Sequence, residues 1–185
     1  FRVINSQGED VFSSFGNVAG VGWDITSNQL FVVSSGFNFR GANVRRHSLG
    51  DRGSSVGEVV VPRNVNFDLG ADGVRILAVS GTFAYFVDMS SSRVLQLDMR
   101  DGSAVAGSAG RPTRATASPD GRYVLFGGGA PGDTLLVDMK QSRSIANVSG
   151  EMTNFGLISS DADRVFVEGH RRHHVGLEWL LLAFA

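Results

Sequence analysis

One pattern recurs four times along the chain: a turn rich in Asp, Asn or Gly, followed by a short apolar strand. The clearest copy centres on Asp120, in Ser-Pro-Asp-Gly before Arg-Tyr-Val-Leu-Phe, and another on Asp72, in Gly-Ala-Asp-Gly before Val-Arg-Ile-Leu-Ala-Val. These two residues are 48 positions apart, Asn28 precedes Asp72 by 44, and Asp161 follows Asp120 by 41. An interval of about 40–50 residues predicts repetition of one supersecondary unit.

Units of this length are typical of a β-propeller, in which each repeat is a four-stranded blade. The expected strands are short and bounded by Gly, Ser, Asp and Asn, and no apolar period of 3.6 is sustained over a helix length, so we expect little helix. We predict an all-β chain of about three complete four-stranded blades plus two half-blades, as a fragment of a larger propeller. The alternative is a closed four-bladed ring, in which strands from both ends complete one blade and remove an open sheet edge.

The strand pattern divides the chain into six segments. They are the outer strands of an incomplete blade at 1–16, blades at 17–62, 63–110 and 111–150, the inner strands of an incomplete blade at 151–169, and a basic, His-containing loop with an apolar tail at 170–185. In the second blade, residues 65–69 compete with 74–80 for the innermost strand. The tail is too apolar to remain exposed, so we expect it to pair with another strand or with a partner.

Three segments, 118–124, 94–99 and 135–139, resemble WD-repeat and YVTN-type propellers. The two dipeptides that mark the WD-repeat family, Trp-Asp and Gly-His, occur once each, at 23–24 and 169–170, out of order and not in every blade. The wider propeller group includes interaction scaffolds, lactonases and quinone-cofactor dehydrogenases. The resemblance therefore implies the architecture and leaves the activity open.

The composition restricts the partners and the chemistry. Seventeen basic and 18 acidic residues give a formal charge of −1, which does not indicate binding to nucleic acid. The chain has no cysteine, which excludes disulfides and thiolate metal sites. Its longest apolar run, 179–185, is too short to span a membrane. We expect a cytoplasmic location over an extracytoplasmic one, although a chain without cysteine is compatible with either.

Two regions are candidates for binding a protein partner. A basic stretch surrounds the expected third strand of the first blade and consists of Arg40, Arg45, Arg46, His47 and Arg52. Such a patch on a propeller rim suits an acidic partner or RNA, and its alternative is a solvated outer strand. The second region is the apolar tail, which contains Trp179.

The densest cluster of functional groups lies near the C-terminal end. His170, His173 and His174 provide three imidazoles within five residues, and Asp161 and Asp163 provide two carboxylates nearby. Imidazole and carboxylate groups are ligands for divalent metals, but neither group completes a ligand set. We predict no cofactor, with a divalent metal at these residues as the alternative.

The other polar candidates fit a structural role in turns better than a catalytic or metal-binding role. Asp72 with Gly73, and Asp120 with Gly121, occupy turn positions. In the second of these turns, Asp120 can bond its own backbone and Gly121 accepts a positive φ. Asp88, Asp98 and Asp138 each follow an apolar strand, so they too are expected to serve turns.

Together these features favour a noncatalytic propeller scaffold that mediates protein–protein interaction within a larger protein or assembly, with self-association to complete the ring as a further expectation. The alternative is a propeller enzyme of the lactonase or quinoprotein-dehydrogenase type, with a metal or cofactor in the central channel. We expect the scaffold rather than the enzyme, because His occurs only at four positions, which leaves few candidates for the base of a catalytic triad.

Overall fold

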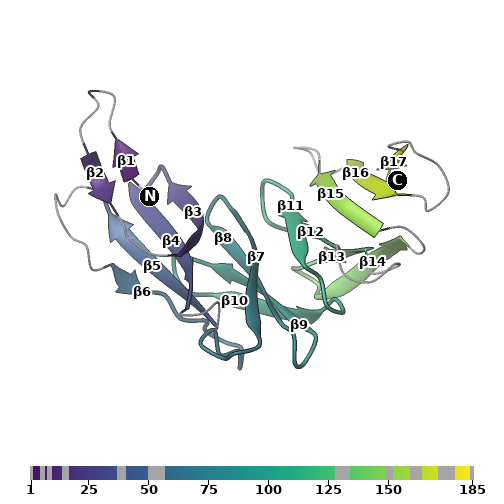
Figure 1. Cartoon of the computed structure of the whole chain (residues 1–185), viewed down its shortest axis with the longest axis horizontal. Coiled ribbons are helices and arrows are strands. Elements are labelled where there is room, and N and C mark those ends of the chain that lie inside the picture. Colours follow the sequence, from purple (N-terminus) through teal and green to yellow (C-terminus); the bar gives the residue numbers. More distant parts are fainter. Residues whose placement is uncertain are drawn as a thin grey trace.

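The computed structural model describes residues 2–4, 7, 10–13, 17–36, 41–49, 57–127, 134–148, 152–158, 164–170 and 178–183. These residues form antiparallel β-sheets that follow one another along an arc (Figure 1). No helix long enough and apolar enough to cross a membrane occurs in these ranges.

Three sheets have four strands each, paired in the order of the sequence. The first blade contains β3 (Val18–Asp24), β4 (Gln29–Ser35), β5 (Ala42–Ser48) and β6 (Glu58–Val59). The second blade contains β7 (Val74–Ser80), β8 (Phe83–Asp88), β9 (Arg93–Asp98) and β10 (Ala104–Ser108). The third blade contains β11 (Arg114–Ala117), β12 (Tyr123–Gly127), β13 (Thr134–Asp138) and β14 (Arg143–Val148).

The innermost strand of the second blade is β7, so residues 74–80 occupy the place for which 65–69 competed. Residues 65–69 form no strand and instead cross from the outer edge of the first blade toward β7. Val65, Phe67 and Leu69 turn their side chains into the core between the two blades. Residues 65–69 therefore alternate between apolar and polar because one side of this connection is buried, although the connection is not a strand of the sheet.

The middle strands of the second blade are buried on both faces, because this blade lies between the first and the third. Strand β8, for example, is almost wholly buried, with Ala84 and Phe86 facing the first blade and Tyr85 and Val87 facing the third. This explains why its sequence is a continuous apolar run rather than an alternation. The hydrophobic core thus consists of layers between successive blades.

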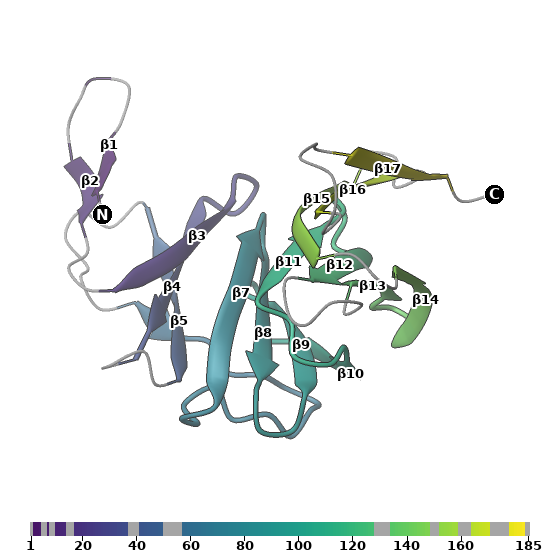
Figure 2. The same ribbon diagram turned by 45° about the vertical axis from the view of Figure 1, so that its right-hand side comes forward.

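The innermost strands β3, β7 and β11 lie next to one another around a common centre, with β15 (Met152–Ile158) beside β11 (Figure 2). Close approach of β3 to β7 requires small residues. A Cβ at Gly22 would overlap the carbonyl oxygen of Gly81, in the turn between β7 and β8. The glycines of the first inner strand therefore set the spacing of the first two blades.

The two ends of the chain differ from the pattern expected for a shared blade. The C-terminal sheet continues past β15 and β16 (Arg164–His170) to a third strand, β17 (Glu178–Ala183), which pairs with β16. The apolar tail thus pairs with a strand of its own sheet. From the sequence we predict that this blade ends at residue 169, because the repeated turn pattern does not occur before β17.

The N-terminal strands β1 (Arg2–Ile4) and β2 (Asp10–Ser13) form a separate two-stranded sheet. This hairpin and the C-terminal sheet lie at opposite ends of the arc in Figure 1. Among the described residues the two sheets do not pair, which differs from the closed four-bladed ring.

Candidate functional site

A cavity of about 270 Å³ opens at the outer edge of the first two blades, and we call it the rim site. Its walls come from β5, β6, the extended segment after β6, and the turn between β9 and β10. The side chains and backbone that line it belong to Arg46, Glu58, Val59, Val60, Val61, Arg63, Arg100, Asp101 and Gly102. The site combines three cations, two carboxylates and exposed aliphatic groups.

The Arg46 guanidinium joins the two blades across the rim site. It donates one hydrogen bond to the Glu58 carboxylate on the neighbouring strand and another to the carbonyl oxygen of Arg100 in the second blade. Hydrogen bonds with an ionised partner are among the stronger ones in proteins. Arg46 is thereby held in one orientation.

The turn after β9 supplies the opposite wall. The Asp98 carboxylate accepts hydrogen bonds from the backbone N–H of Arg100 at 3.0 Å and from the Arg100 guanidinium at 2.6 Å. The Asp101 carboxylate accepts the backbone N–H of Ser103 at 2.7 Å, and this bond lowers the pKa of Asp101 from its ordinary value. Both carboxylates are fixed by the turn itself.

The segment after β6 is bound to this turn. The backbone N–H of Arg63 donates to the carbonyl oxygen of Gly102 at 2.7 Å, and Arg63 forms a parallel bridge with Ser103. Gly102 has a φ of +79°, and a Cβ there would lie 2.7 Å from the carbonyl oxygen of Val61. Gly102 therefore permits a close approach that any larger residue would disturb.

The predicted basic stretch is divided between two faces of β5, because successive side chains of a strand point in opposite directions. Arg46 lines the rim site, whereas Arg45 donates to the carbonyl oxygen of Gly57 at 2.9 Å. His47 is only 5% exposed and packs against Gly57, so it is not part of the rim surface. Arg40 and Arg52 lie outside the described residues.

The metal candidates are only partly covered by the structure. Asp161, Asp163, His173 and His174 lie outside the described residues, whereas His170 is the last residue of β16. Trp179, the other predicted partner-binding residue, lies on β17 opposite Glu168. Within the described ranges, no three His, Cys, Asp or Glu side chains are grouped closely enough to hold a metal ion. The metal site stays a prediction.

The predicted turn residues hold turns and connect blades. Asp120 accepts the Ser118 hydroxyl at 2.6 Å and the backbone N–H of Arg122 at 3.1 Å, while Gly121 has a φ of +71°. The carbonyl of Gly121 accepts the buried Gln96 amide of the second blade.

In the preceding repeat, the carbonyl oxygen of Asp72 accepts from the Arg75 guanidinium at 2.9 Å. The carbonyl oxygen of Gly73 accepts the backbone N–H of Met89 at 3.1 Å. These residues shape the ends of the second blade.

Of the residues at the rim site, Arg46 is among the candidates that the sequence predicts. Four others are not predicted: Val59, Val61, Arg63 and Arg100. The one local signal is that residues 59, 61 and 63 are spaced two apart in an extended segment, so their side chains point to the same side. Their proximity to Arg100 depends on how the first two blades pack, which no local pattern reveals.

No known protein family and no curated protein matches the sequence. Solved structures do match. Hydrazine synthase from Kuenenia stuttgartiensis is 15% identical in sequence and has a TM-score of 0.55. The alignment covers 97% of this chain and 49% of the hydrazine synthase chain. The β-propeller domain of Cps50 (Swd1) from Myceliophteria thermophila has 13% identity, a TM-score of 0.55, and coverages of 85% and 50%.

TolB from Acinetobacter baumannii has 17% identity and a TM-score of 0.52, with coverage of 98% of this chain and 45% of its own. The chain spans about half the length of each of these structures. At such identities the likeness concerns the fold alone. Together with the radial order of the blades, it identifies the chain as a β-propeller repeat protein that contains part of a propeller.

Proposed function

We propose that this chain is a noncatalytic scaffold that binds a protein partner at the rim site. The observation that carries the proposal is the pair Val59 and Val61, which are 49% and 58% exposed beside charged groups held in fixed positions. Protein–protein interfaces combine an apolar centre with a polar border, and Arg is enriched in them. The rim site has this composition.

The mixture of charges favours a protein over a nucleic acid. Arg46, Arg63 and Arg100 share the site with Glu58 and Asp101. Binding to a phosphate backbone depends on cations that neutralise it, and carboxylates among those cations would oppose it. A protein surface offers charges of both signs together with apolar side chains, so it suits this site better.

The strand-end carboxylates support a structural role over a catalytic one, because their oxygens are used by the turns. Asp88 accepts hydrogen bonds from Ser90 and Ser91, Asp98 binds Arg100, and Asp138 binds Arg122.

The enzyme alternative would be favoured by a stoichiometric divalent metal in the purified protein that is lost in an Asp161→Asn variant.

The proposal can be tested by site-specific photo-crosslinking in an extract of the source cells. A photoreactive phenylalanine analogue replaces Val61, and adducts are identified by mass spectrometry. We expect one dominant protein adduct, which becomes weaker when Arg63→Glu reverses the adjacent charge.

The matched control places the same analogue at Ile145, which is 37% exposed on β14 of the third blade. Both positions are surface aliphatic residues on outer parts of a blade, so unspecific reaction should be equal. The same adducts in the same yield at both positions would contradict the docking function, as would insensitivity to Arg63→Glu in a variant with an unchanged melting temperature.

A further inference from the structure

The outermost strand of the second blade, β10, has a free edge. It pairs with β9 on one side, and no strand of the described part of the chain pairs with its other side. A strand in this position has unused backbone N–H and C=O groups, which are the groups that another extended chain needs for pairing.

The pairing with β9 determines which backbone groups point outward. The N–H of Asp98 donates to the carbonyl oxygen of Ser103 at 2.9 Å, and the register then continues without a shift to the end of β10. Alternate residues of an antiparallel pair exchange hydrogen bonds, so Val105 and Gly107 are bonded to β9. The residues between them direct their N–H and C=O groups away from β9, and these are Ala104, Ala106 and Ser108.

The chain itself pairs with this edge at one residue, next to the rim site. Arg63 forms a parallel bridge with Ser103, the residue before β10. Asn64 follows with a φ of +64°, in the left-handed region that interrupts an extended segment. The connection then turns into the core between the first two blades, where Phe67 packs. Among the described residues, no other backbone segment bonds to the rest of the β10 edge.

The β10 edge also lacks the features that protect outer strands from pairing with another chain, which are short length, charged side chains, proline and bulges. Strand β6 has two residues and contains Glu58, and β14 contains Arg143 and has a shift in its register with β13. Strand β10 has five residues, contains neither a charge nor a proline, and pairs with β9 without a shift. Of the outer strands in the three blades, β10 is therefore the best suited to accept another strand.

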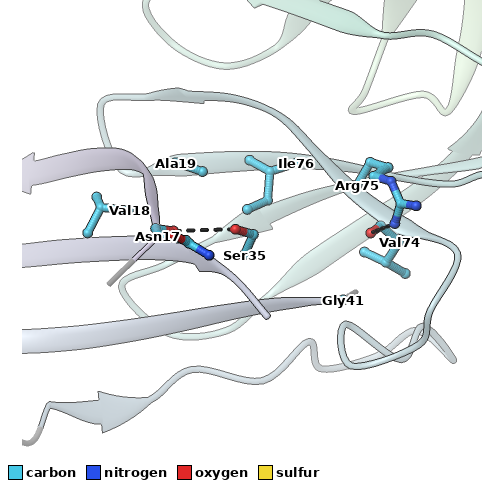
Figure 3. A pocket seen from close by; sticks show the side chains of 8 residues that line it. All are labelled: Asn17, Val18, Ala19, Ser35, Gly41, Val74, Arg75 and Ile76. Carbon is cyan, nitrogen blue, oxygen red and sulfur yellow. Dashed lines mark hydrogen bonds between the residues drawn. The ribbon is translucent and has the colours of Figure 1, made fainter. Parts of the chain in front are cut away.

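The inner edges of the blades are less accessible, because the inner strands lie next to one another. Strand β7 lies beside both β3 and β11. The space between β3 and β7 is a cavity of about 320 Å³, and side chains from both strands line it, among them Val18, Ala19 and Ile76 (Figure 3). Because β10 is the outermost strand of its blade, a partner reaches it without displacing the next inner strand.

We propose that β10 accepts an extended segment of the protein partner as a fifth strand of the second blade. In this mode of recognition, backbone hydrogen bonds provide the affinity and alternate side chains provide the specificity. The occupant is a segment of the rim-site partner, because Arg63 and Gly102 line the rim site and lie beside the start of this edge. The inference therefore rests on the docking function proposed above, and it extends the docking surface along β10.

The side chains of β10 indicate the chemistry of the added segment. Ala104 and Ala106 pack on the core shared with the first blade, and Val105 packs on the core shared with the third. Cross-strand neighbours contact one another in a sheet, and small side chains leave room for larger ones on the added strand. An uncharged segment rich in β-branched residues fits this edge, because such residues favour strands and no charge on β10 would pair with a charged side chain.

Disulfide tethering tests the proposal on the full chain, which has no cysteine of its own. Ser108→Cys places a thiol at the exposed end of β10, and the probe is the peptide acetyl-Cys-Gly-Thr-Val-Thr-Val-Thr-amide, which can lie antiparallel to β10. Two further peptides carry N-methyl groups, one on both valines and the other on the first two threonines. Successive N–H groups of a strand point to opposite sides, so only one of these two sets faces β10.

We expect one methylated peptide to form the mixed disulfide with an equilibrium constant about tenfold below that of the unmodified peptide, because it loses two hydrogen bonds to β10. The other methylated peptide should match the unmodified one. The matched control is Ile145→Cys, at a partly exposed position on the outer strand β14, where all three peptides should react equally.

A change in β10 itself locates the binding. Ala106→Pro in the Ser108→Cys protein removes an outward N–H and leaves the bonds between β10 and β9, so it should lower the equilibrium constant of the unmodified peptide about tenfold. The methylated peptides require no change in β10, so their comparison is decisive even if Ala106→Pro unfolds the protein.

Equal reaction of all three peptides at Ser108→Cys would overturn the proposal, and a photo-adduct at Val61 would then leave the rim site supported alone. A difference between the methylated peptides without any Val61 adduct would support strand addition and contradict the rim site. Light scattering of the wild type and Ala106→Pro tests a second copy of this chain as the occupant. We expect equal masses, and a lower mass for Ala106→Pro would overturn the partner segment in favour of pairing between two copies.

Discussion

At the residue scale, the recurring element is an Asp at the end of a strand, followed four residues later by a backbone in the left-handed region. The Asp carboxylate accepts a backbone N–H two or three residues on, which closes the turn. The pairs of Asp and left-handed residue are Asp24 with Asn28, Asp88 with Ser92, Asp98 with Gly102, and Asp138 with Ser142. The same turn chemistry thus serves the first, second and third blades.

Asp88 gives this turn a measurable pH dependence. The hydroxyl groups of Ser90 and Ser91, followed by the Ser90 backbone N–H, lower the pKa of Asp88 to about 2 from an ordinary value near 3.8. A carboxylate with a lowered pKa contributes stability that is fully present above its unfolded value and is lost as the pH falls toward its folded value. We expect this contribution to disappear between pH 4 and pH 2.

Urea denaturation at pH 6 and pH 3 tests the role of Asp88 by comparing the wild type with Asp88→Asn. The variant should be less stable at the higher pH and should lose less stability on acidification, because it lacks the titrating group. If both proteins lose stability in parallel, Asp88 does not hold its turn through the charged carboxylate.

At the element scale, the sequence predicts where strands lie along the chain better than it predicts which blades' side chains come into contact. Strand β8 and strand β12 are predictable because each is an apolar run between turn residues, and burial on both faces produces such runs. The rim site is not predictable, because Arg46 and Arg100 belong to different blades and meet only through blade packing. Strand β17 is not predictable from the repeat, because the repeated turn pattern does not occur between β16 and β17.

The glycines of β3 test the packing of elements. Gly22→Ala should destabilise the protein by about 1–3 kcal/mol, since the added methyl group would overlap the Gly81 carbonyl and the end of Met99. Gly107→Ala is the matched control on β10, where the Cβ would lie 3.7 Å from Val94, an ordinary contact. Thermal unfolding of both variants measures the difference, and an equal change in melting temperature would argue against the close approach of β3 to the second blade.

At the scale of the whole molecule, the arc repeats one mode of contact between blades. One face of β3 packs on the second blade through Gly20 and Gly22, whereas Val21 and Trp23 alternate with them and are 36% and 48% exposed. In the second blade, the corresponding face contributes Tyr85 and Val87 to a core with the third blade. On this face the first blade therefore exposes two apolar side chains of its inner strand, whereas Leu30 and Val32 of β4, opposite them, are buried.

The exposed side chains Val21 and Trp23 predict self-association of the 19.7 kDa chain. Light scattering after size exclusion should give a mass above that of the monomer, and Trp23→Asp should reduce it to the monomer because a charge on this face opposes burial. A monomer at every concentration for the wild type would show that the face does not join two copies.

The packing of the first blade on the second underlies the rim site, and the absence of cysteine allows a direct test. A Cβ at Gly20 would lie 2.9 Å from the Cβ of Val79 on β7, so a small outward shift brings a Gly20→Cys, Val79→Cys pair to the separation of about 3.8 Å that a disulfide needs. The control pair is Gly20→Cys with Val105→Cys, on the opposite edge of the second blade. After mild oxidation, mass spectrometry should find an intramolecular disulfide in the first pair alone. No disulfide in the first pair, or equal yield in the control, would contradict the blade packing on which the rim site depends.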